Sequence, residues 1–406
     1  MKRIALMTLT SLLLCGCNTK DLRPADEKPL ASKKVAKMRG TYYIGLAEAK
    51  LAQGRLDAAY RLSKDANDML ETDLTAKMLF ARVCLEMGRP GEAMEALKPV
   101  VAEHPDNNPA IYLYGVCYEM MGEYEKALDL FGVIVRREPD SVDAAIAMAE
   151  TQMVLGRHDH ARKTIQSIMP VASTRLDAWE VAGRIDQALG NDAKAVESFR
   201  QCVAMAPKNP TYSLLLADSL WANSEKNKAA SCYRNYIALV GKAVPVNVFR
   251  RLAVYYTETG NVALARQSYQ AAVQADPGNP NHYLAQGRME CQQGDYARAI
   301  ECCDRVLRNT SHSQEALMLK AYAQIESSKA ADAVETLLYA QKSHPRLTLV
   351  YVMLGRAYTE LGDDVKARKC FEFVLRASPN NQIAQRYIQY LRPEGPALAT
   401  TAARVE

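Results

Sequence analysis

Small residues recur at a fixed interval along almost the whole chain. Ten alanines share one phase of this pattern, each 34 residues after the one before, except for a single step of 36. They are Ala59, Ala93, Ala127, Ala161, Ala195, Ala229, Ala265, Ala299, Ala333 and Ala367. A constant period of this size is typical of stacked helical hairpins, because each hairpin buries its apolar face only against its neighbours. The sequence therefore predicts an all-α array of repeated helix pairs.

A second small position lies in the first helix expected for each unit. Counted from the start of the unit, position eight is always alanine or glycine: Ala47, Ala81, Gly115, Ala149, Gly183, Ala217, Ala253, Gly287, Ala321 and Gly355. We expect this position to face the recurring alanine of the second helix, since only small side chains let two backbones approach closely. Glycine at most inter-helix turns suits the positive φ of a helix C-terminus.

The third unit carries the most complete pattern. It reads Ile111, Tyr114-Gly115, Tyr118, Gly122, Ala127, Phe131 and Pro139, and the fifth and tenth units are close to it. This pattern resembles the tetratricopeptide repeat (TPR). The resemblance implies a right-handed superhelical solenoid of about ten helix-turn-helix repeats. It covers residues 40–381, with units that start near residues 40, 74, 108, 142, 176, 210, 246, 280, 314 and 348.

Two further segments frame this array. Residues 382–392 have apolar side chains at helical spacing, which predicts a capping helix, and residues 393–406 are expected to be disordered. Two extra residues fall within 241–245. We interpret that insertion as a small kink in the array rather than as a domain boundary.

The amino terminus has the pattern of an export signal. A short basic stretch precedes a mostly apolar run from Ile4 to Leu14, which is too short to span a bilayer. Leu14-Cys15-Gly16-Cys17 then resembles the lipobox of bacterial lipoproteins. This resemblance implies a signal peptide over residues 1–16 and a diacylglycerol on Cys17. A plain secretory signal or a fortuitous apolar start is the alternative interpretation.

The residues after Cys17 indicate where the protein is held. Asn18 stands where an aspartate favours retention in the inner membrane of enterobacteria, so the resemblance implies the periplasmic face of the outer membrane. Residues 17–39 are polar with two prolines. We expect them to form the lipidated cysteine and a flexible tether.

Catalytic, metal and cofactor sites are not expected. The chain has no phosphate-binding glycine loop and no nucleophile elbow. His158-Asp159-His160 could bind a metal weakly, but a solvated turn is the better interpretation without further ligands. Formal net charge is only +5, with no basic run or face, so nucleic acid is not an expected partner. Eight cysteines beyond Cys17 lie in predicted helices, where burial in the core is favoured over disulfides.

The remaining candidate site is the concave surface of the first helices. In the resembling family, positions two, five, nine and twelve line this groove. The residues assigned to partner binding are Ile44, Met78, Arg82, Tyr112, Val116, Ile146, Glu150, Arg184, Arg250, Arg288, Tyr322 and Arg356. We expect Met78 and Tyr112 to lie outside the inter-helix core, so that glutamate there removes partner binding without unfolding the array.

These features favour a binding function over an enzymatic one. We expect a non-enzymatic scaffold, lipid-anchored to the membrane, that recruits protein or peptide partners in the periplasm and takes no small-molecule substrate. Assembly of a pilus, secretin or secretion system is the first candidate, by analogy of architecture. Scaffolding of cell-wall enzymes or polysaccharide export is an alternative. A soluble intracellular adaptor whose amino terminus is not a signal is another.

Overall fold

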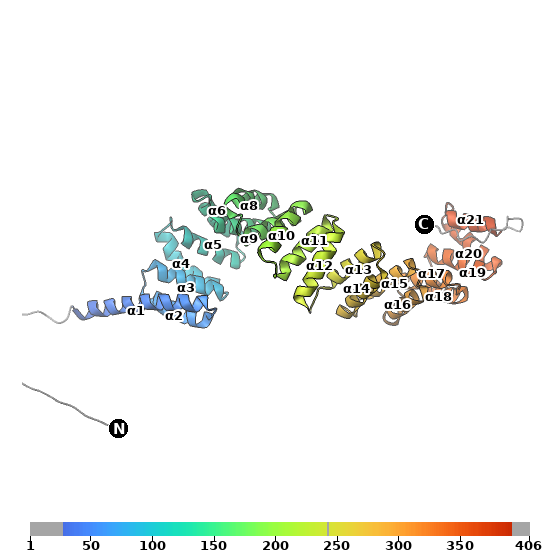
Figure 1. Ribbon diagram of the computed structural model, residues 1–406, viewed down its shortest axis with the longest axis horizontal. Helices are drawn as coiled ribbons and strands as arrows, with labels where there is room; N and C mark the ends of the chain where they lie inside the picture. Colours follow the sequence, from blue (N-terminus) through green and yellow to red (C-terminus); the bar gives the residue numbers. More distant parts are fainter. Residues whose placement is uncertain (1–26, 242, 392–406) are drawn as a thin grey trace, which may run out of the picture. The chain divides into compact units, whose positions relative to one another are not determined.

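The computed structural model describes residues 27–241 and 243–391. All regular structure in these two ranges is α-helical, in 21 helices (Figure 1). The all-α architecture of repeated helices predicted from the sequence is therefore confirmed. The chain divides into two compact parts, residues 1–190 and 191–406, which we describe separately as the first part and the second part.

The helices of both parts follow the periodicity of the sequence. The first part contains α1 (Glu27–Ala52), α2 (Leu56–Met69), α3 (Leu74–Glu86), α4 (Pro90–Glu103), α5 (Asn108–Met120), α6 (Tyr124–Arg137), α7 (Val142–Val154), α8 (His158–Ala172) and α9 (Leu176–Ala188). The second contains α10 (Asp192–Met205), α11 (Pro210–Ala222), α12 (Lys226–Val240), α13 (Val246–Glu258), α14 (Val262–Ala275), α15 (Pro280–Gln292), α16 (Tyr296–Asn309), α17 (Gln314–Glu326), α18 (Ala330–Ser343), α19 (Thr348–Glu360), α20 (Asp364–Ala377) and α21 (Gln382–Tyr390). Odd-numbered helices are the first helices of their repeats.

The prediction of a flexible tether over residues 17–39 is wrong for residues 27–39. These residues form the first half of α1. Its two prolines suggested a non-helical segment. Pro29 is the third residue of α1, and the backbone nitrogens of a first helical turn have no intrahelical partner to lose. A proline there does not oppose the helix. The signal peptide, Cys17 and the tail 393–406 lie outside the described residues.

The boundaries inside the chain also differ from expectation in one respect. The two compact parts meet between Gly190 and Asn191, within the fifth sequence repeat, where no boundary was predicted. Gly241 and residues 243–245 lie between α12 and α13, and both Gly241 and Ala243 have a positive φ. Helix α21 lies within the segment assigned to the capping helix. No helix in the described ranges is both long and apolar enough to cross a bilayer.

The turns between paired helices share one hydrogen-bonding pattern. After α3, Gly88 has a φ of 70° and donates to Leu85, while Arg89 donates to Cys84 at 2.8 Å. This is the Schellman motif, which satisfies the last carbonyls of a helix and requires a left-handed residue. The turn after α11 has the same bonds with Ser224 at a φ of 62°. The repeat backbone therefore persists where the sequence lacks the glycine.

Close packing explains the small residue at position eight, and at two glycines the close partner differs from the expected alanine. A Cβ atom on Gly115 would lie 2.6 Å from the ring of Phe131, and one on Gly355 would lie 2.6 Å from Phe371. Both rings are fully buried and lie four residues after the recurring alanine. At Gly287 the Cβ position lies 3.2 Å from the Leu319 side chain and 3.6 Å from the Ala299 carbonyl oxygen. At Gly115 and Gly355, glycine therefore makes room for an aromatic ring.

The described cysteines lie in the helices as free thiols. The eight described cysteines are helical and form no disulfides with one another, and five of them are buried. Burial raises the pKa of the Cys302 and Cys303 thiols to about 12. Both thiols are therefore protonated near neutral pH and act as small apolar side chains.

Candidate partner-binding groove

The main candidate site in the second part is a groove across three successive first helices. It has a volume of about 630 Å³ and is formed by α15, α17 and α19. Its lining residues are Arg288, Gln314, Glu315, Met318, Leu319, Tyr322, Ile325, Leu349, Met353 and Arg356. The sequence repeat places the same helix face side by side in each unit, so a continuous surface results.

Helix α17 supplies the centre of the groove. Met318, Tyr322 and Ile325 are spaced four and three residues apart, so all three lie on one face of α17. Met318 and Ile325 are buried and belong to the apolar core, while Tyr322 is 39% exposed. Leu349, at the start of α19, is 48% exposed. The groove therefore presents a tyrosine and a leucine to solvent above a packed apolar floor.

Charged pairs border this apolar centre. Arg288 forms an ion pair with Glu315, and Arg356 pairs with Glu326 at 2.7 Å and with Glu360 at 3.6 Å. Burial and the nearby Glu326 carboxylate raise the pKa of Tyr322. Its phenol therefore remains a neutral hydrogen-bond donor near physiological pH. The arrangement can anchor an apolar side chain and accept polar contacts at its rim.

The structure brings three of the twelve predicted groove residues together in this one site. Arg288, Tyr322 and Arg356 all line it, and Arg250 is exposed on α13 without being among its lining residues. Sequence reasoning missed Met353, which occupies position six of its unit. Position two of each unit was expected to line the groove in general. Leu349 and Glu315 occupy this position in their units, so the sequence pattern could have identified them.

In the first part the predicted groove residues fall into two groups. Arg82, Glu150 and Arg184 are exposed, as a groove requires. The apolar members pack toward the core, and Ile146 is only 6% exposed within a core cluster of α7–α9. Ile146 therefore offers little exposed surface to a partner.

Met78 and Tyr112 are also more internal than expected. The Tyr112 ring lies 5.7 Å from the Phe131 ring, and burial raises the pKa of its phenol. Met78 is half-buried against the core of α3–α5. Position five of a first helix faces both the groove and the next helix, so its side chains serve both surfaces. We therefore correct the expectation that glutamate at these positions leaves the fold intact.

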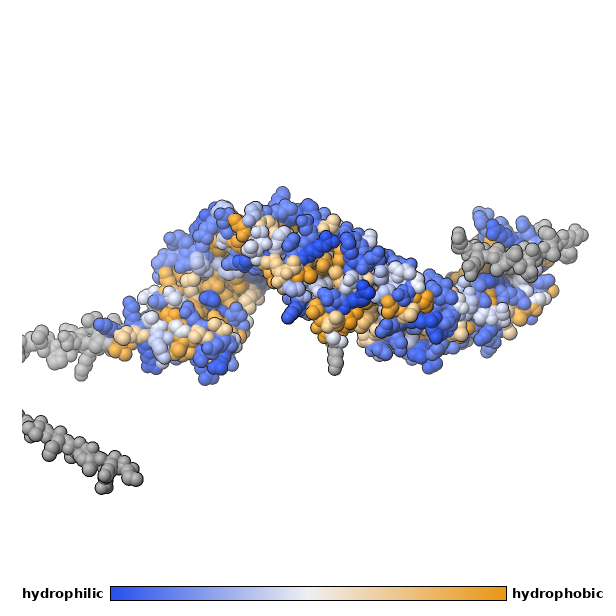
Figure 2. Space-filling view, in the orientation of Figure 1, coloured by the Kyte–Doolittle hydropathy of each residue, from blue (hydrophilic) through white to orange (hydrophobic). Residues whose placement is uncertain are grey.

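The first part has an acidic surface along its first helices. Burial and, to a smaller extent, repulsion from the Glu150 carboxylate raise the pKa of Glu119. Although Glu150 has an exposed surface, desolvation by the surrounding residues and the Glu180 carboxylate raise the pKa of Glu150. Figure 2 shows hydrophobic residues around α3–α5.

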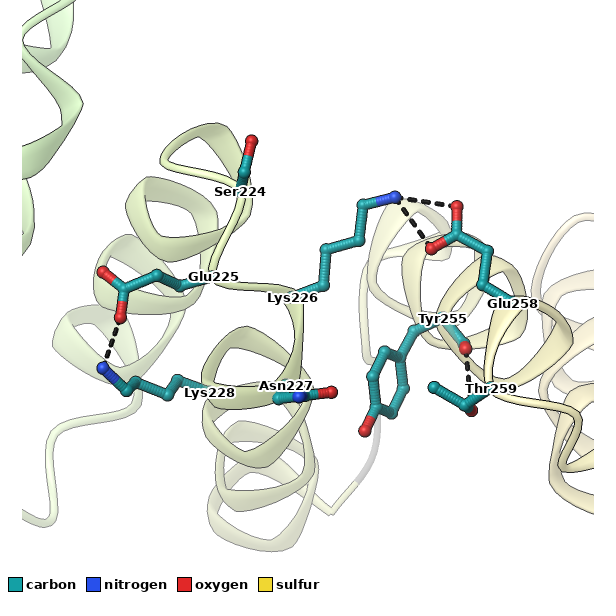
Figure 3. A pocket seen from close by; sticks show the side chains of 8 residues that line it. All are labelled: Ser224, Glu225, Lys226, Asn227, Lys228, Tyr255, Glu258 and Thr259. Carbon is teal, nitrogen blue, oxygen red and sulfur yellow. Dashed lines mark hydrogen bonds and ion pairs between the residues drawn. The ribbon is translucent and has the colours of Figure 1, made fainter.

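A separate hollow of about 390 Å³ lies where the turn before α12 meets the end of α13 (Figure 3). Lys226 donates to both carboxylate oxygens of Glu258 at 2.7 Å, and Lys228 pairs with Glu225. The charges around the hollow are therefore paired with one another. The Lys226–Glu258 pair joins two successive repeats, whereas Lys228 and Glu225 belong to the same repeat.

The histidine cluster lies at the start of a second helix. His158 and His160 lie in the first turn of α8, where His158 is half-buried and His160 is exposed. Within residues 27–241 and 243–391, no group of three histidine, cysteine, aspartate or glutamate side chains could hold a metal ion.

Family models for the tetratricopeptide repeat match residues 50–114, 85–137, 118–185, 176–209, 214–280, 284–348 and 349–381. Tetratricopeptide repeat protein 7B of Homo sapiens is 27% identical over 130 residues, which are 32% of this chain and 15% of that protein. Lipopolysaccharide assembly protein B of Escherichia coli strain K12 is 24% identical over 203 residues, covering 48% of this chain and 52% of that protein. The chain thus matches about half the length of these relatives or less.

Among solved structures, the thermophilic TPR protein TTC0263 of Thermus thermophilus is similar. It is 20% identical, with a TM-score of 0.41, and the match covers 45% of this chain and 99% of that chain.

Proposed function

Because the chain belongs to the tetratricopeptide repeat family, we propose that it is a non-enzymatic scaffold whose groove on α15, α17 and α19 binds a protein partner. Proteins of this family bind protein or peptide partners. The observation that carries the proposal is the exposure of Tyr322 and Leu349 between two arginine–carboxylate pairs. Aromatic and aliphatic anchors with a polar rim are typical of interface centres.

The groove is tested with Tyr322→Glu combined with Leu349→Glu. Both side chains are exposed, so we expect partner affinity to fall about tenfold or more while the fold persists. Partners are captured by crosslinking from cell envelopes, identified by mass spectrometry and then titrated in purified form. The melting temperature by circular dichroism should stay within about 5 °C of the parent.

A matched control uses Leu338→Glu with Val365→Glu. These two apolar residues are also exposed, but they lie on the second helices α18 and α20. We expect this variant to bind normally. Equal affinity for the parent and the groove variant would contradict the assignment of the groove, as would equal losses in both double variants.

We further propose that the scaffold is lipid-anchored at Cys17 on the periplasmic face of the bacterial outer membrane. The support is the signal-like apolar run followed by Leu14-Cys15-Gly16-Cys17. We expect palmitate labelling that disappears in Cys17→Ala, and accumulation of the uncleaved chain when globomycin blocks lipoprotein signal peptidase. An unlabelled and unprocessed parent chain would instead favour the soluble intracellular adaptor.

For the system served, we propose assembly of a pilus, secretin or secretion system. The support is the combination of a lipobox-like start with a repeat array, by analogy of architecture. A second candidate, polysaccharide export or cell-wall synthesis, is favoured by the similarity to a protein named for lipopolysaccharide assembly. The identity of the crosslinked partners decides between the two candidates.

A further inference from the structure

The first helix is longer than the other first helices and carries an exposed apolar stripe. Helix α1 has 26 residues, against 13 for α3 and α5, and it extends beyond its pairing with α2 (Figure 1). Val35, Met38 and Tyr42 are 64%, 67% and 65% exposed. Their spacing of three and four residues places them on one face of α1.

The opposite face of α1 makes the contacts that hold the first helix pair together. Gly40 is buried against Leu70, since a Cβ there would lie 2.6 Å from the Leu70 side chain. Ala47, further along the same helix, is fully buried. The stripe of Val35, Met38 and Tyr42 therefore points away from the helix packing and is not needed for it.

Basic side chains flank this stripe. Lys34, Lys37 and Arg39 are exposed, and within the described part of the chain none of them forms an ion pair with a carboxylate. Arg39 donates instead to the Tyr43 hydroxyl at 2.8 Å. Between residues 34 and 52 the sequence has one acidic residue, Glu48. Figure 2 shows hydrophobic and hydrophilic residues side by side on this end of α1.

We propose that this face of α1 docks on a bilayer surface that contains anionic phospholipids. Basic residues beside an apolar stripe are the pattern of helices that lie in the membrane interface, where tyrosine is also favoured. This inference rests on the proposed function, because the lipid anchor at Cys17 is what would bring α1 to a membrane. The step from Cys17 to Glu27 is short, with a reach of at most about 35 Å, so the anchor would keep α1 close to the lipid.

A second copy of the chain is a poorer occupant of the same face. Two such stripes packed together would bring Lys34, Lys37 and Arg39 of one copy near the same cations of the other. Juxtaposed like charges oppose such an interface, whereas anionic headgroups neutralise them. Charge complementarity therefore favours an anionic lipid surface over a second copy of the chain as the occupant of this face.

The test measures the protection of α1 from amide hydrogen exchange in the full chain. The protein is reconstituted in vesicles of phosphatidylcholine, or of phosphatidylcholine with phosphatidylglycerol, and amide hydrogen exchange is measured over residues 34–43. We expect slower exchange on the anionic vesicles. Val35→Glu/Met38→Glu/Tyr42→Glu should abolish the difference. Lys34→Gln and Lys37→Gln should each reduce the protection about fivefold.

A matched control replaces three exposed apolar residues elsewhere, Val154→Glu, Leu361→Glu and Val365→Glu, and should leave α1 protection unchanged. Palmitate labelling of the same samples separates the docking from the anchor. A labelled chain whose α1 exchanges equally on both vesicles overturns the docking and leaves the anchor intact. An unlabelled chain whose α1 is protected on anionic vesicles supports the docking alone. Protection that rises with protein concentration in detergent would identify a second copy and overturn the proposal.

Discussion

Replacing Gly115 with alanine should lower the free energy of unfolding by about 1–3 kcal/mol, the usual cost of overpacking a core. The added Cβ would lie 2.6 Å from the ring of Phe131, which is fully buried. Alanine is otherwise the better helix former by about 0.5–1 kcal/mol, so a loss of stability must come from the contact. Chemical denaturation with an unchanged slope measures the difference.

The matched control is Gly45→Ala in α1. Gly45 is also helical, but nothing lies within 4 Å of its Cβ position, so this change should stabilise the protein by about 0.5–1 kcal/mol. In a Phe131→Leu background, Gly115→Ala should cost at least about 1 kcal/mol less. Alanine opposite leucine already occurs in the second repeat, where both Ala81 and Leu97 are fully buried. Equal costs in the two backgrounds would contradict the explanation.

Replacing Arg266 with methionine should have the largest effect on stability, about 3–5 kcal/mol. The Glu290 side chain is completely buried, and the Arg266 guanidinium donates to both of its carboxylate oxygens. Methionine preserves much of the packing but leaves a buried carboxylate without its cation. The same guanidinium also contacts Asp295 at 2.9 Å, so it joins α14, α15 and the turn before α16.

A double variant separates charge from packing in this network. Arg266→Met with Glu290→Leu removes both charges, so we expect it to recover most of the stability that Arg266→Met loses. The control Arg305→Met breaks the pair with Glu301, in which both side chains are about half exposed. It should cost no more than about 1 kcal/mol. A double variant as unstable as Arg266→Met would show that packing, and not the unpaired charge, dominates.

Part of the groove could be located from sequence, because the repeat fixes which positions of a first helix share a face. Arg288, Tyr322 and Arg356 were assigned from position nine alone, and all three line one groove. Ile146 shows the limit of that reasoning. Position five points between the groove and the neighbouring helix, and its exposure depends on how closely the next repeat packs. Periodicity specifies direction on a helix but not distance to the next one.

The sequence by itself determined the repeat architecture, since small residues at a period of 34 leave paired helices as the way to bury the apolar positions. It also determined where most helices begin and end, because glycine and proline act through the local backbone. Tertiary structure alone decided that Gly115 accommodates Phe131, that Arg266 neutralises the buried Glu290, and that Met353 lines the groove. These contacts join residues of different helices, and their geometry depends on packing distances that no local pattern encodes.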